Sequence, residues 1–220
     1  MQNLERNSNE EIKSILGFFS IDKIELPEAM ELAQSVVEDI KRPELFEARK
    51  YDKFSTEMIL KYLRSSHEVY LSKKLPEIEQ QLIHVHNKFP EYRLFHILYL
   101  FFKDYKNHLT SHIEHEENTV FRYIEYLLKA NKEVSIVESI QILQGSPSLN
   151  HFLDEHTDTE QDLTAMRKVL NSDVEYKQLH PISMLLNQLS ILENNLKVHA
   201  KLEDEVLLPK ALELEAKLIS

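Results

Sequence analysis

Apolar positions recur at spacings of three and four residues along most of this chain, and no stretch alternates apolar and polar residues as a strand does. This periodicity predicts amphipathic helices. Four long runs carry it, over about 55–88, 90–130, 148–171 and 176–217. A weaker helical segment over about 132–145 ends at a glycine. The chain is therefore expected to be all-α.

A shorter helical run near the start of the chain is bracketed by Pro27 and Pro43. Proline suits the first turn of a helix and also ends one. Short connections between the four long runs favour antiparallel neighbours. We therefore expect a helical extension over residues 1–54, of unassigned role, followed by a mainly antiparallel four-helix bundle over 55–220.

The core-facing stripe of the second long helix turns polar in its middle. It runs through Leu94, Leu98, Phe101 and Tyr105, meets His108 or Leu109, and continues through His112, Glu116, Val120 and Tyr123. A helix puts residues three and four apart on one face. The stripe therefore predicts that an imidazole and a carboxylate point into the core.

The other three long helices also have polar residues within the core-facing stripe. Leu192 and Leu196 lead to His199 and Glu203 in the last helix. His67 follows Leu63 in the first long helix, and His156 follows Phe152 in the third. Each helix of the expected bundle thus offers an inward histidine.

Distances along the chain predict that these groups share one level. His67 and His112 are equally far from the Phe89–Pro90 turn, and His156 and His199 are nearly so from the polar stretch NSDVEYKQ. In antiparallel pairs, residues equally far from a turn lie side by side. Four histidines and two glutamates are therefore expected to meet in one layer.

A buried glutamate costs several kcal/mol unless a cation lies beside it. His112 and Glu116, like His199 and Glu203, have the i, i+4 spacing that places both side chains on one helix face. Such a layer suits two metal ions bridged by the glutamates. Imidazole and carboxylate ligands fit iron, and manganese or zinc by the same criterion. The predicted metal ligands are His67, His112, Glu116, His156, His199 and Glu203.

Four stretches that contain these residues resemble the helix signatures of hemerythrin-like domains: SSHEVYLSKKLPEIE, LTSHIEHEENTVF, FLDEHTDTE and LKVHAKLEDEVLLPKA. The similarity covers about 55–217 and is closest to the di-iron proteins that repair iron centres, the iron–sulfur cluster repair family. Those proteins usually begin with a Cys-Cys motif, which residues 1–54 lack.

The resemblance implies a non-haem pair of iron ions with oxo and carboxylate bridges. It implies binding or reduction of nitric oxide, oxygen or peroxide, in protection or repair of iron centres under nitrosative or oxidative stress. An electron donor and an iron–sulfur client protein would be partners, and the chain would act as a di-iron oxidoreductase or as a repair protein. The alternative is an oxygen- or iron-responsive sensor or carrier without turnover.

Composition narrows the classes of function. A formal net charge of −11 disfavours nucleic acid and anionic membranes as partners. The absence of cysteine removes disulfides and thiolate metal sites. The N-terminal stretch lacks a signal-peptide pattern and no run reaches the length of a membrane span, so we expect a cytoplasmic protein.

The remaining polar residues have weaker assignments. Glu155 is a candidate proton relay beside His156. His108 and His115 lie one turn from His112 and are candidates for a supporting hydrogen bond or an alternative ligand. Solvated positions are expected for the other histidines and flanking acids, and packing roles for four tyrosines: His84, His86, His96, His180, Glu114 and Glu117; Tyr62, Tyr70, Tyr105 and Tyr123. His151 is not expected to be a ligand.

Overall fold

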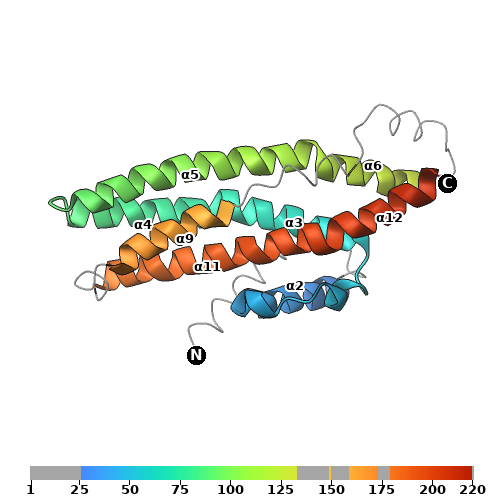
Figure 1. The fold of residues 1–220 in the computed structure, drawn as a ribbon, viewed down its shortest axis with the longest axis horizontal. Helices are drawn as coiled ribbons and strands as arrows, with labels where there is room; N and C mark the ends of the chain where they lie inside the picture. The colour runs from blue at the N-terminus through green and yellow to red at the C-terminus, as the bar shows by residue number, and fades with distance from the viewer. Residues whose placement is uncertain (1–25, 133–148, 150–158, 173–178, 220) are drawn as a thin grey trace.

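The computed structural model describes residues 26–132, 149, 159–172 and 179–219, and within these ranges every regular element is helical. The long helices run along one axis of the molecule (Figure 1). Their bounds are α2 Leu26–Lys41, α3 Thr56–Val69, α4 Leu75–Lys88, α5 Arg93–Asn118, α6 Val120–Lys132, α9 Thr159–Ser172, α11 His180–Leu202 and α12 Leu208–Ile219. Short helical turns are η1 Pro43–Leu45, η2 Ala48–Tyr51, η3 Tyr70–Lys74 and η4 Glu203–Leu207.

Two of the predicted long helices are continuous but contain a wide turn. The segments η3 and η4 are π-helical. A proline lies two residues after the end of each: Pro76 after η3 and Pro209 after η4. Proline has no N–H, and in an α-helix its ring clashes with the carbonyl four residues earlier. The π turn removes that clash, so α3 and α4 form one long helix, as do α11 and α12.

The helix starts follow local chemistry. The Ser55 hydroxyl accepts a hydrogen bond of 3.1 Å from the Met58 N–H and caps α3, an interaction that typically contributes about 1 kcal/mol. The last long helix was expected from about residue 176. Leu179 instead has extended backbone and α11 begins at His180, because Pro181 suits the first turn of a helix.

The predicted second long helix is interrupted at Thr119, between α5 and α6. The Thr119 hydroxyl donates to the His115 carbonyl at 2.6 Å, and the Asn118 amide donates to the Glu114 carbonyl at 2.6 Å. Side chains that bond to these carbonyls compete with the helical backbone and bend helices. The sequence prediction of one unbroken helix was therefore wrong at this position.

The helices α4, α5, α9 and α11 pack so that each contacts two of the others: α4 contacts α5 and α11, and α9 contacts the same two helices. The colours in Figure 1 show that neighbours in this set run in opposite directions. Beyond them, α6 packs against α12 and α3, and α2 packs against α11 and α3. The arrangement is compatible with a four-helix bundle and a covering N-terminal helix.

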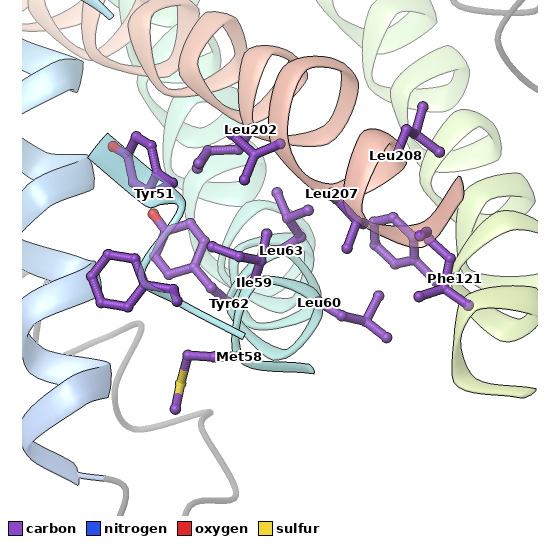
Figure 2. Close-up of a cluster of buried hydrophobic side chains, with 14 of the residues drawn as sticks. Tyr51, Met58, Ile59, Leu60, Tyr62, Leu63, Phe121, Leu202, Leu207 and Leu208 are labelled. Atoms are coloured by element: carbon purple, nitrogen blue, oxygen red, sulfur yellow. The ribbon is translucent and has the colours of Figure 1, made fainter. Parts of the chain in front are cut away.

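Buried apolar side chains form two clusters along the molecule. One, the α3–α6–α12 cluster, also takes in α2 and includes Ile59, Leu63, Phe121 and Leu207 (Figure 2). The other, the α4–α5–α9–α11 cluster, lies toward the turn between α4 and α5. The two clusters adjoin near Val69 and Tyr70, and the buried polar residues described below lie close to this junction in the sequence.

The buried face of α5 is rotated from the expected stripe. Phe95 and Phe102 are buried, whereas Phe101, expected in the core, is 39% exposed and Leu94 is only partly buried. Both stripes keep the spacing of three and four residues, so periodicity alone could not distinguish them. Farther along, Tyr105, Leu109 and Glu116 are buried, which agrees with the expectation.

The helix predicted between Pro27 and Pro43 is present as α2. Its Asp39 side chain accepts a hydrogen bond from the buried Tyr51 hydroxyl and forms an ion pair with Lys50 at 2.9 Å. Burial, followed by the bond to Asp39, raises the pKa of Tyr51 far above its usual value. These contacts join α2 to η2 within the extension, and α2 itself packs against α11 and α3. Within the described ranges, no helix is both long and apolar enough to cross a membrane.

Candidate metal centre

Four of the predicted site residues lie buried at one level of the molecule. His67 is in the last turn of α3, Glu116 is near the end of α5, and His199 is in the last turn of α11. Glu203, the first residue of η4, follows His199 by one turn. Three long helical segments thus bring two imidazoles and two carboxylates together beside residues of both apolar clusters.

The two histidines face one another. The Nε2 atoms of His67 and His199 are 3.0 Å apart, and the Nε2 atom of His67 is 3.3 Å from Oε2 of Glu116. One ligand atom from each of these three residues lies within 4.8 Å of the other two. Among the described residues this group has the composition, burial and proximity to hold a metal ion.

The carboxylate of Glu116 is shared between two histidines. Its Oε2 atom faces His67, while its Oε1 atom lies 2.8 Å from Nε2 of His112, one turn earlier on α5. His112 is nearer the surface, with 23% of its side chain exposed. Oε2 of Glu203 lies 4.0 Å from Nε2 of His199. Glu116 therefore presents one oxygen toward the His67–His199 pair and the other toward His112.

The two buried glutamates have opposite protonation behaviour. Burial alone would raise the pKa of Glu116, but hydrogen bonds from His112 and His67 outweigh it and hold the pKa far below its usual value. Burial raises the pKa of Glu203, and its charge repulsion with Glu116 and its hydrogen bond to that residue raise it further. Glu203 therefore retains a proton at pH values where Glu116 is ionised.

The His67 ring has a raised pKa and fixed aromatic contacts. Burial lowers the pKa of the His67 imidazole, but hydrogen bonds to Glu116 and Glu117 outweigh burial, so the pKa is raised overall. The His67 ring stacks on Phe121, with centroids 5.3 Å apart and planes within 7°. The edge of Tyr70 meets the His199 ring at 5.6 Å. These aromatic contacts fix the ring planes so that the Nε2 atoms converge.

Two residues that contact the histidines were not predicted. Glu117, expected to be a solvated charge, lies 2.8 Å from Nδ1 of His67 through its Oε1 atom. The Ser66 hydroxyl lies 2.9 Å from Nδ1 of His199. Periodicity reports which helix face is buried but not which side chains bond across helices. The only sequence signal for either residue is a small polar residue or an acid next to a predicted ligand.

The other predicted positions divide into two groups. His156, a predicted ligand, and Glu155, the predicted proton relay, lie outside the described residues, as do His151 and all but the first residue of the weak helix predicted over 132–145. His108 and His115 are exposed on α5 and lie away from the buried face that carries Glu116. The solvated positions expected for most of the others agree with the structure: His84, His96, His180 and Glu114 are exposed, and His86 is partly buried with its ring 5.2 Å from that of His96.

All four tyrosines are packed in the apolar clusters. Tyr62 and Tyr123 belong to the α3–α6–α12 cluster, and Tyr70 and Tyr105 belong to the α4–α5–α9–α11 cluster. The Tyr123 hydroxyl donates to the Glu215 carboxylate. Packing roles were expected for all four, and only Tyr70 also contacts a predicted ligand ring among the aromatic contacts of the described residues.

No family model, curated protein or solved structure matches this chain. The similarity of its four helical stretches to hemerythrin-like domains stays a prediction.

Proposed function

We propose that this protein binds metal in the buried layer and that the layer holds two ions. The observation that carries this proposal is the convergence of two Nε2 atoms, 3.0 Å apart, with a buried carboxylate oxygen 3.3 Å from one of them. Neutral imidazoles that present lone pairs to each other repel, so this arrangement favours a proton or a metal ion between them. The raised pKa values of His67 and Glu203 describe protons that a metal ion would displace.

The geometry supports two neighbouring positions. His67, His199 and Oε2 of Glu116 converge on a first position, which we name the inner position. Oε1 of Glu116 and Nε2 of His112 point to a second, nearer the surface. Glu116 would bridge the two, and Glu203 would lose its proton and join them. The proposed ligand set also includes His156, on the sequence pattern alone, because this residue lies outside the described ranges.

The proposed ions are iron, in a hemerythrin-like four-helix bundle. Histidine nitrogen and carboxylate oxygen without sulfur suit iron, while manganese and zinc accept the same ligands. An iron pair supplies redox and Lewis-acid chemistry for nitric oxide, oxygen or peroxide. The chain's contribution is to bury the site beside both apolar clusters, orient the imidazoles and admit a small ligand beside the partly exposed His112. Protection or repair of iron centres under stress is the role that the helix signatures suggest.

Metal analysis tests the proposal directly. Protein purified without chelator, and metal-free protein loaded anaerobically with ferrous iron, should each contain about two metal ions per chain. The double variant His67→Ala/His199→Ala should lose the inner position. The variant His86→Ala/His96→Ala removes another pair of neighbouring imidazoles away from the site and should keep full metal content. Wild-type protein that stays metal-free after loading would contradict the proposal.

Activity assays then separate the chemical roles. Reduction of nitric oxide or peroxide by the loaded protein, with an electron donor supplied, is expected for the protective role. Reversible oxygen binding without turnover would favour the sensor or carrier instead.

One contact favours that second candidate. The Lys201 ammonium, two residues after His199, donates to the Pro43 carbonyl at 3.2 Å, and η2 packs against η4. The N-terminal extension therefore touches the segment that carries two proposed ligands. If the protein is a sensor, proteolysis of residues 26–54 should differ between the metal-free and loaded states.

A further inference from the structure

Each histidine of the inner position forms a hydrogen bond through its second ring nitrogen. Nδ1 of His199 lies 2.9 Å from the Ser66 hydroxyl, and Nδ1 of His67 lies 2.8 Å from Oε1 of Glu117. Both Nε2 atoms face the inner position. Each ring therefore turns Nε2 toward the inner position and Nδ1 toward a supporting side chain, and the two supporting side chains differ in chemistry.

The Ser66 hydroxyl already uses its proton in a hydrogen bond within its own helix. This hydroxyl donates to the Leu63 carbonyl at 2.7 Å, and a serine hydroxyl has only one proton to donate. Toward His199 it can therefore only accept. The ring must present a protonated Nδ1 to Ser66, which leaves Nε2 of the neutral imidazole with its lone pair directed at the inner position.

Glu117 imposes the same tautomer on His67 through a charged acceptor. Its Oε2 atom is 3.0 Å from Nε of Arg64, and Arg64 also pairs with Glu125. A carboxylate held by an arginine only accepts hydrogen bonds. Nδ1 of His67 is therefore the donor to Glu117. When the ring is doubly protonated, its Nε2 proton faces Oε2 of Glu116, 3.3 Å away, and when the ring is neutral its Nε2 atom is left for a ligand position.

We propose that Ser66 and Glu117 are positioning residues that hold His199 and His67 in the Nδ1-protonated tautomer, so that both Nε2 atoms are ready for one metal ion. This inference rests on the proposed metal site. Hydrogen bonds to ligand histidines fix the tautomer and ring orientation, and their loss typically weakens metal binding by about 10–100-fold. Ser66 and Glu117 pre-organise the inner position before metal arrives.

The chain offers a matched control for each residue. Ser65 precedes Ser66 on the same buried turn, and its hydroxyl bonds to the Lys61 carbonyl within the helix. Glu125 forms an ion pair with the same Arg64 as Glu117 does, so Glu125→Ala removes one partner of the arginine and leaves the Glu117–His67 contact in place. Ser66→Ala and Glu117→Ala should each raise the Kd for ferrous iron about 10–100-fold, measured anaerobically against a competing chelator. Ser65→Ala and Glu125→Ala should change it less than about threefold.

The tautomers can be read without metal. Long-range proton–nitrogen correlation spectra of histidine-labelled, metal-free protein at alkaline pH distinguish Nδ1-protonated from Nε2-protonated rings. Wild-type protein should show the Nδ1-protonated ring at both His67 and His199. Ser66→Ala should mix the forms at His199 alone, and Glu117→Ala at His67 alone. Ser66→Thr keeps the hydroxyl and should restore the wild-type spectrum, and circular dichroism should show that each variant is folded.

The two measurements separate two kinds of failure. If Ser66→Ala leaves the His199 tautomer and the iron affinity unchanged, the positioning role is wrong even when the wild-type protein binds two ions. If the tautomers respond as expected but no variant, and no wild-type protein, binds iron, then the positioning role stands and the proposed metal site is wrong.

Discussion

Glu193 and Glu203 are both about 1% exposed and lie three helical turns apart on one long helix, yet their neighbours carry opposite charges. Glu193 accepts hydrogen bonds from Arg167 at 2.8 Å, Lys197 at 2.7 Å and Thr164 at 2.8 Å. Burial alone would raise the pKa of Glu193, but these donors outweigh it and lower the pKa. The chain itself supplies the cations that this carboxylate needs.

Glu203 is surrounded differently. After burial, the strongest influences on its pKa are the carboxylates of Glu116, Asp204 and Glu117, and all of them raise it. A buried carboxylate beside other carboxylates is costly unless it binds a proton or a cation. The contrast indicates that Glu193 is a structural ion pair, whereas Glu203 has carboxylates around it and is held neutral by a proton. In the proposed function a metal ion would replace that proton.

The largest expected difference between the two regions is in metal content. Glu116→Ala removes the carboxylate that faces both proposed positions, and Glu203→Ala removes its neighbour. Each variant should lose one or both ions by elemental analysis of protein purified without chelator. Glu193→Ala, an equally buried change on the same helix, should retain both.

A folded Glu116→Ala variant with full metal content would contradict the proposed difference between Glu116 and Glu193. Far-ultraviolet circular dichroism supplies the necessary check on folding. Metal loss from Glu193→Ala with an intact helical signal would likewise show that the two carboxylates do not differ in the way proposed.

The next effect is on stability with metal. Binding to the folded state alone adds about 2.7 kcal/mol when free metal is at 100 times the Kd. For a chain of this length that corresponds to a rise in Tm of about 5–10 °C. Wild-type protein and Glu193→Gln should both show this rise on ferrous loading, and Glu203→Gln should show little or none. Calorimetry of metal-free and loaded samples measures it.

A smaller effect appears in the metal-free protein as the pH changes. The pKa of Glu203 is raised on folding, so its contribution is fully present below its unfolded pKa and is lost as the pH rises through the folded value. Glutamine resembles the protonated acid and does not ionise, so the stability of Glu203→Gln relative to wild type should increase as the pH rises above the ordinary glutamate pKa, 4.5, by about 1 kcal/mol or more.

Glu193 should show the opposite sign. Its pKa is lowered on folding, so its contribution is present above the unfolded pKa and is lost as the pH falls through the folded value. Glu193→Gln should therefore destabilise the protein at neutral pH by about 1–3 kcal/mol, and this cost should shrink in acid. Urea unfolding at several pH values measures both variants. Equal signs for the two substitutions would contradict the comparison.

Hydrophobic periodicity predicted the helices and much of the candidate site. The all-helical class, α2, the long helix through α3 and α4, and the meeting of His67, Glu116 and His199 follow from spacing and from distance to a turn. These features depend on helix geometry, which repeats regularly along a chain.

The features that were missed depend on contacts between particular side chains. Phe102 is buried and Phe101 is not. Two stripes with the same spacing run side by side on α5, so periodicity could not tell which of them faces the core. The interruption at Thr119 comes from a hydroxyl that bonds to a carbonyl of the preceding turn. Glu117 supports His67 across helices, which no periodicity on its own helix could reveal.

The smallest expected effect tests the register of α5 beside the site. His115 is exposed, whereas His112 is 2.8 Å from Glu116. His115→Ala should leave metal content unchanged and alter the free energy of unfolding by no more than about 0.5 kcal/mol, as exposed substitutions usually do. His112→Ala should lower metal content at the position nearer the surface. Elemental analysis of the two variants, with circular dichroism as the check on folding, makes the comparison. If His115→Ala empties the site and His112→Ala leaves it full, the helix is rotated from the orientation described. Glu116 would then no longer face His67, and the contrast with Glu193 would lose its basis.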